Sequence, residues 1–188
     1  MTHRHVIPTI AFAVLLGARP VAAQPRAAID LVTHSEISID RPAALIWPRI
    51  LDPSAWKQGA SLRHHAGPVG AVGEIFAAVE PADPGKVAFY VENVELEPRR
   101  RRTIKLIAPA GATGSGGSLI GYASWTLTES GGRTVVRYDV YSETRLDPAQ
   151  AAATSAAERL EAERTARATS QARFDRELAA LKRLAEGS

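Results

Sequence analysis

The strongest constraint on the fold lies in the middle of the chain, where short β-strand patterns follow one another with only turns between them. Between residues 60 and 144, apolar and β-branched segments are separated by turn sequences such as PADPG and SGGR. None of these connections is long enough for a crossover helix, so neighbouring strands must pair antiparallel. Together with residues 34–40, which alternate around Ile37 and Ile39, the pattern predicts seven strands in one sheet.

A helical segment is expected directly after the first strand. Pro42 suits the first turn of a helix, and the apolar residues of 43–50 recur at helical spacing. Pro48 cannot donate a hydrogen bond to the carbonyl of Ala44, so we expect a kink, or two short helices, near Trp47.

A second helical segment ends the chain. Asp147 can cap it, Pro148 suits its first position, and Gln150 lies where a capping-box partner would be. No proline follows before Glu186, which predicts one long helix, with an interruption in its alanine-rich first part left open. The apolar residues come late, so the last three turns should pack most tightly; they are Phe174, Leu178, Leu181 and Leu184.

The first residues have the layout of a signal peptide. A weakly basic start precedes an apolar run over residues 6–18, and small residues follow up to Ala23. A membrane span would need roughly 20 apolar residues. This run is shorter, contains Pro8 and is followed by Arg19. We therefore expect residues 1–23 to be cleaved.

Cleavage would leave a chain that begins at Gln24, with a flexible stretch over 24–32 and a single domain over 33–186. We expect this protein in a bacterial periplasm or secreted. The leader contains Arg4 and Arg19 and no acidic residue, so its removal lowers the net charge from +3 to +1. The charge therefore says little about partners, whereas export argues against a nucleic-acid partner. The rest of the chain has no apolar run long enough to cross a membrane. The absence of cysteine excludes disulfides.

Two local motifs have simple structural interpretations. PRRRR, residues 98–102, lies between two strand patterns and predicts a solvated hairpin, although an anionic surface or acidic ligand remains an alternative. Replacing Arg99–Arg102 with serine should then change stability by at most about 0.5 kcal/mol. GPVGAVG, residues 67–73, lacks the Lys-Ser/Thr ending and following helix of a phosphate loop, which predicts a turn with a close backbone crossing.

The order of elements is strand, split helix, six strands and long helix. In this order the chain resembles the START and polyketide-cyclase-like superfamily, the helix-grip fold also called SRPBCC, over residues 33–186. The resemblance rests on five segments in sequence: ISIDRPAALIWPRILDPSAW, GPVGAVGEI, VENVELEPRRRRTIKL, SWTLTESGGRTVVRYDV and LAALKRLAE. It implies an α+β fold, in which a curved seven-stranded antiparallel sheet grips the C-terminal helix around a cavity for an apolar or amphipathic ligand.

Several residues are candidates for the lining of that cavity. Tyr138 lies on a cleanly alternating strand, while Trp47 and Trp56 lie on either side of the proline break and either wall the entrance or belong to the core. Arg167 interrupts an apolar helix stripe, together with Arg164 and Gln171, so that part either borders the cavity or is plain surface. The candidate ligand-binding residues are Trp47, Trp56, Tyr90, Trp125, Tyr138 and Arg167.

Candidates for catalysis are weaker. Glu92 could be a cavity carboxylate, but Phe89 and Val91 compete for the inward face of the same strand. His64 and His65 would point to opposite faces of a strand, so they cannot both ligate one metal. Tyr138, Glu92 and His64 are the remaining acid or base candidates.

The sequence contains no nucleophile, triad or metal motif and predicts no cofactor. We therefore expect a protein that binds or carries a small hydrophobic ligand. The alternatives are an aromatic cyclase or dehydratase acting on a polyketide-like substrate, and an interaction module with a filled core. The oligomeric state stays open.

Overall fold

The computed structural model describes residues 28–57, 61–80, 82–109, 119–146 and 148–187. The expected signal peptide, its cleavage site and the start at Gln24 lie outside the described residues, as do Asp147 and the side chain of Gln150. The helices in the described ranges include none that is both long and apolar enough to cross a membrane.

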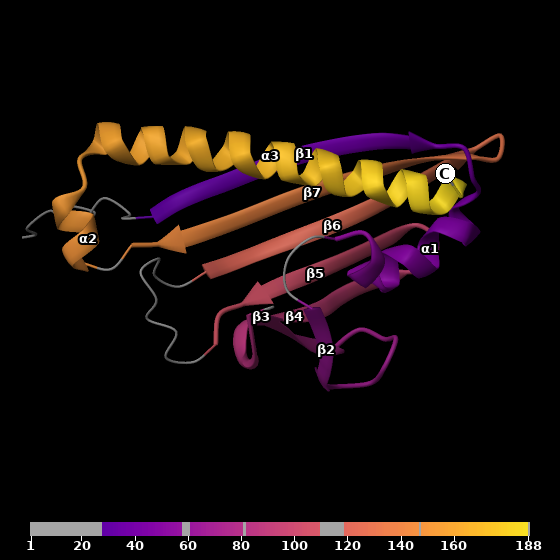
Figure 1. Ribbon diagram of the computed structural model, residues 1–188, viewed down its shortest axis with the longest axis horizontal. Helices are drawn as coiled ribbons and strands as arrows, with labels where there is room; N and C mark the ends of the chain where they lie inside the picture. The colour runs from indigo at the N-terminus through magenta and orange to yellow at the C-terminus, as the bar shows by residue number, and fades with distance from the viewer. Residues whose placement is uncertain (1–27, 58–60, 81, 110–118, 147, 188) are drawn as a thin grey trace, which may run out of the picture.

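Seven strands form one antiparallel sheet in the order β1-β7-β6-β5-β4-β3-β2 (Figure 1), which confirms the predicted sheet. The sheet is open, with β1 and β2 at its two edges. The strands are β1 (Ala28–Ile39), β2 (Ser61–Ala66), β3 (Ile75–Glu80), β4 (Asp83–Glu97), β5 (Arg101–Ile107), β6 (Leu119–Ser130) and β7 (Arg133–Arg145).

The first strand begins earlier than expected. Residues 28–32 were assigned to a flexible stretch, but they pair with the end of β7, from Ala28 opposite Arg145 to Val32 opposite Tyr141. The short alternating pattern at 34–40 gave no signal for this extension, because the pairing partner lies more than 100 residues away in the chain.

Within the described residues, four helical elements accompany the sheet: α1 (Ala43–Leu51), the 3-10 helix η1 (Pro53–Ala55), α2 (Pro148–Ala153) and α3 (Ala156–Glu186). Figure 1 shows α3 running along β1, with α1 near its C-terminal end. Helix α1 contacts β6, and Arg102 on β5 donates to the carbonyls of Ile50 and Leu51 at its C-terminal end.

The expected split near Trp47 is wrong in its position. Helix α1 continues through Pro48 to Leu51, and the chain breaks at Asp52 instead. Ala44 and Pro48 are both exposed, so the hydrogen bond that Pro48 cannot make is lost on the solvent side of α1. Water can therefore satisfy the freed carbonyl, and the helix persists.

The C-terminal helix is interrupted in its alanine-rich part, between α2 and α3. Ser155 caps α3 by accepting from the Glu158 backbone N–H at 3.2 Å, and its own N–H donates to Glu158 Oε2 at 2.7 Å. These hydrogen bonds lower the pKa of Glu158. The capping box explains why a new helix begins here.

The last turns of α3 pack into the core, as predicted. Phe174, Leu178 and Leu181 are buried, whereas Leu160 is 49% exposed.

The glycine loop after β2 also has the expected close crossing. A Cβ on Gly67 would lie 2.1 Å from the carbonyl oxygen of Gly73, so a side chain there is excluded.

Candidate functional site

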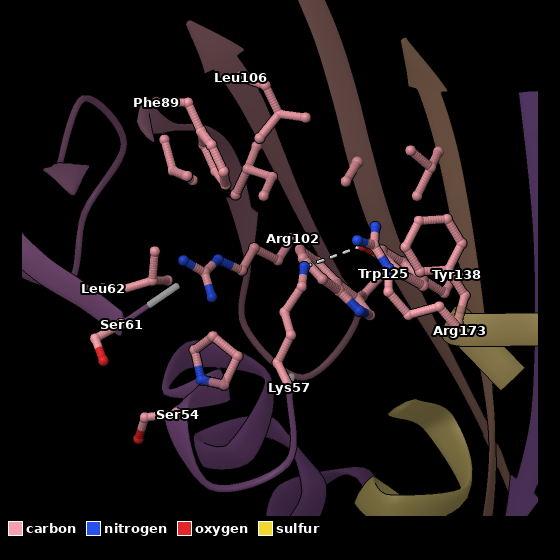
Figure 2. Close-up of a pocket in the computed structure, with 16 residues that line it drawn as sticks. Ser54, Lys57, Ser61, Leu62, Phe89, Arg102, Leu106, Trp125, Tyr138 and Arg173 are labelled. Carbon is pink, nitrogen blue, oxygen red and sulfur yellow. Dashed lines mark hydrogen bonds between the residues drawn. The ribbon is translucent and has the colours of Figure 1, made fainter. Parts of the chain in front are cut away.

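A cavity of about 230 Å³ lies between the concave face of the sheet, the η1 segment and the middle of α3 (Figure 2). Alternate side chains of β4 to β7 point toward it, and most of these side chains are apolar. The lining residues are Pro53, Ser54, Lys57, Ser61, Leu62, Phe89, Val91, Arg102, Ile104, Leu106, Ala123, Trp125, Tyr138, Val140, Arg173 and Phe174.

Three aromatic rings form one side of the cavity. Trp125 on β6 and Tyr138 on β7 are opposite each other in the strand register, and their rings stack at 4.7 Å with an angle of 8°. The ring of Phe174 on α3 meets Tyr138 edge-on at 4.9 Å. Such contacts fix the rings in place and link the sheet to the helix.

Lys57 follows η1 and reaches the aromatic rings. Its Nζ donates to the hydroxyl of Tyr138 at 3.1 Å and lies 5.2 Å from the ring centroid of Trp125 and 5.4 Å from that of Tyr138 (Figure 2). These are cation–π distances. The ammonium group is therefore held at the aromatic side of the cavity.

Arg102 is the second basic residue of the lining and is almost fully buried, at 1% exposure. Its Nε donates to Asn93 Oδ1 at 2.9 Å, and its Nη1 donates to the carbonyls of Ile50 and Leu51. Burial lowers the pKa of Arg102 to about 10, although Glu74 and other groups act in the opposite direction. Arg102 thus ties β5 to the C-terminal end of α1.

The interpretation of PRRRR as an entirely solvated hairpin is therefore wrong for one of its four arginines. Arg99 lies in the turn with φ of 66°, and Arg101 is exposed and paired with Glu95 at 3.1 Å. Because side chains alternate along β5, Arg102 points to the face opposite that of Arg101 and shares the inward face with Ile104. Extending the alternation of Ile104 and Leu106 backwards along the strand was the available signal.

Arg173 is the third basic residue of the lining, and it comes from α3. Its Nε lies 3.7 Å from Glu177 Oε1, and its guanidinium carbon lies 4.6 Å from the ring centroid of Phe174. The predicted polar stripe lies earlier on α3 and outside the lining. Arg164 and Arg167 are exposed, and Gln171 donates to the carbonyl of His34.

The structure brings together two of the six residues predicted to contact a ligand, since Trp125 and Tyr138 both line the cavity. Trp56 is buried behind Trp125, with ring centroids 6.5 Å apart, and its Nε1 donates to the Arg49 carbonyl. The other predicted residues also lie outside the lining: Trp47 is half-buried against the core, Tyr90 packs against His65, and Arg167 is exposed.

The acid and base candidates are mostly separated. Phe89 and Val91 are the inward residues of β4, which leaves Glu92 on the opposite face. His64 is exposed, with Nε2 3.2 Å from the carbonyl oxygen of Gly67. Only Tyr138 of the three lines the cavity. Within the described ranges, no group of His, Asp or Glu side chains could hold a metal ion.

No protein-family model matches the sequence, and no curated protein is significantly similar to it. Solved structures do resemble the fold. MLL2253 from Mesorhizobium loti has a TM-score of 0.57 at 16% identity, covering 84% of this chain and 98% of that one. Truncated norcoclaurine synthase from Thalictrum flavum has 0.55 at 15% identity, covering 84% and 94%. CalU16 from Micromonospora echinospora has 0.53 at 16%, covering 83% and 74%.

At such low identity these similarities show the fold alone. It is the helix-grip fold of START-like proteins that the sequence resemblance implied, with a seven-stranded antiparallel sheet and a long C-terminal helix.

Proposed function

We propose that this protein binds or carries a small hydrophobic or amphipathic ligand in the cavity between the sheet, η1 and α3. The observation that supports this is a space of about 230 Å³ in the core, walled by stacked aromatic rings and aliphatic side chains. Pockets of mainly apolar lining with a few placed polar groups are the usual sites for small molecules. An interaction module with a filled core would not leave such a space.

The proposal is tested by binding of a neutral apolar probe, naphthalene, followed by quenching of tryptophan fluorescence. Ala123 on β6 lines the cavity and is 3% exposed, so Ala123→Phe should fill the space and abolish binding. Thr128→Phe places the same ring on an exposed site of the same strand and should bind like the wild type. Equal binding by both variants, or no binding by the wild type, would argue against the cavity as the ligand site.

An enzymatic role of the cyclase or dehydratase kind remains a second candidate, because Lys57 and Tyr138 form a polar pair inside an apolar cavity. An amine and a phenol in contact are groups that can transfer protons. Native mass spectrometry of protein purified from its own host distinguishes the two roles. An unchanged small molecule that co-purifies supports carriage, whereas conversion of that molecule on incubation supports catalysis.

Export is part of the same proposal. The signal-peptide pattern of residues 1–23 supports a mature protein that begins at Gln24 and acts in the periplasm or outside the cell. N-terminal sequencing of protein from the envelope fraction should then start at Gln24. Material in the cytosol that retains residues 1–23 would overturn the location and leave the ligand proposal standing.

A further inference from the structure

The charged side chains that line the cavity are all basic. They are Lys57, which follows η1, Arg102 on β5 and Arg173 on α3, and neither aspartate nor glutamate occurs among the described lining residues. The rest of the wall is mainly apolar, so no acidic side chain of the described lining balances these positive charges. They therefore favour a ligand that carries an anionic group.

These three cations are not equally compensated. Arg102 donates to Asn93 and to two backbone carbonyls, and Arg173 lies near Glu177. Lys57 makes no ion pair with any residue that the structure describes, and its contacts are the Tyr138 hydroxyl and two aromatic rings. Lys57 is therefore the charge that a ligand would neutralise.

The groups around Lys57 also have hydrogen atoms left to donate. An ammonium group has three donors and no acceptor, so the oxygen of Tyr138 accepts from Lys57 and the hydroxyl proton remains available. Trp125 lines the cavity, is 1% exposed, and its Nε1–H has no acceptor within the described part of the chain. Lys57 and Tyr138 thus offer donors without a matching acceptor, whereas Trp125 Nε1 is covered by surrounding protein atoms.

Resting on the proposed function, we propose that the ligand is a small amphipathic carboxylic acid, whose carboxylate accepts hydrogen bonds from Lys57 Nζ and the Tyr138 hydroxyl. Its apolar body lies along the wall formed by side chains such as Phe89, Leu106 and Val140. A cationic ligand is disfavoured, because the ammonium of Lys57 already occupies the aromatic faces that would attract it.

The size of the cavity limits this acid. A cavity of about 150 Å³ holds benzene, and the space here is about 230 Å³. That leaves room for a ring system or short chain together with a carboxylate, and excludes a long-chain lipid held entirely inside.

The test compares 2-naphthoate with 2-naphthamide, which have nearly the same shape and differ in charge. Because a hydrogen bond to a charged group is worth roughly 1.5–3 kcal/mol, the wild type should bind the acid about tenfold to a hundredfold more tightly, measured by calorimetry at neutral pH. Lys57→Met should remove most of this preference. Lys105→Met is the matched control, because Lys105 lies outside the lining and its loss changes the net charge equally.

The outcomes separate this proposal from the function on which it rests. Binding of naphthalene and 2-naphthamide, without preference for the acid, would overturn the carboxylate and keep the cavity as an apolar binding site. A preference for the acid that survives Lys57→Met would overturn the role of Lys57. Failure of all three compounds to bind the wild type would remove both the carboxylate and the cavity proposal.

Discussion

At the scale of the residue, Arg102 stands apart from the three arginines that precede it. It is the one whose hydrogen bonds connect the sheet to the end of α1, through the carbonyls of Ile50 and Leu51. It is also held by Asn93, whose own backbone pairs with the glycine loop through Gly73. One guanidinium thus joins three segments that are distant in the sequence.

Arg102→Met should lower the free energy of unfolding by about 2–4 kcal/mol, because it leaves the buried Asn93 oxygen and two carbonyls without a donor. Arg101→Met is the control, since Arg101 is exposed and its ion pair with Glu95 should contribute less than about 1 kcal/mol. Urea denaturation followed by circular dichroism gives both values. Equal losses in the two variants would contradict the assigned role of Arg102.

At the scale of the element, α3 has two different halves. Its N-terminal turns are mostly exposed, and its capping box is a local feature. Its C-terminal turns bury Phe174, Leu178 and Leu181 against the sheet. The middle turn, where Arg173 and Phe174 meet the cavity, is where the helix passes from surface to core.

Phe174→Ala should therefore destabilise the protein by about 3–5 kcal/mol, the range for removing a buried aromatic side chain. Leu160→Ala removes an apolar side chain from the exposed half of the same helix and should cost no more than about 0.5 kcal/mol. Thermal and chemical unfolding of both variants test this difference. A similar loss in Leu160→Ala would mean that the early turns contribute to the core as well.

The sheet and the late helix could be predicted from the sequence because alternation and helical spacing are local patterns. Trp125 and Tyr138 were found for the same reason, since each lies on a strand that alternates cleanly. Lys57 could not be found this way. It lies outside every strand and helix, and only the tertiary fold brings it to Tyr138, 81 residues further along the chain.

The same limit applies to the candidate residues that lie outside the lining. Their position around Pro48 left open whether Trp47 and Trp56 wall the cavity or belong to the core. In the structure both pack with the core, and Trp56 meets the ring of Trp125 edge-on. The inward face of β4 depended on its register with β3 and β5, which local alternation around Glu92 did not determine.

At the scale of the whole molecule, the cavity is an unfilled part of the core, so a ligand should stabilise the fold that it completes. The sheet, η1 and α3 each contribute to the lining, and global unfolding separates all three. A compound that binds only the folded state raises the unfolding free energy by about 2.7 kcal/mol at a hundred times its dissociation constant.

For a domain of this size, that gain corresponds to an increase in Tm of about 5–10 °C. We expect this increase for the purified protein with 2-naphthoate, measured by differential scanning calorimetry. Thr128→Phe should show the same increase over its own unliganded Tm. Ala123→Phe should show none, because the introduced ring occupies the space. If 2-naphthoate raises the Tm of Ala123→Phe as much as that of the wild type, the compound binds elsewhere on the molecule, and the cavity is then a packing defect without a ligand.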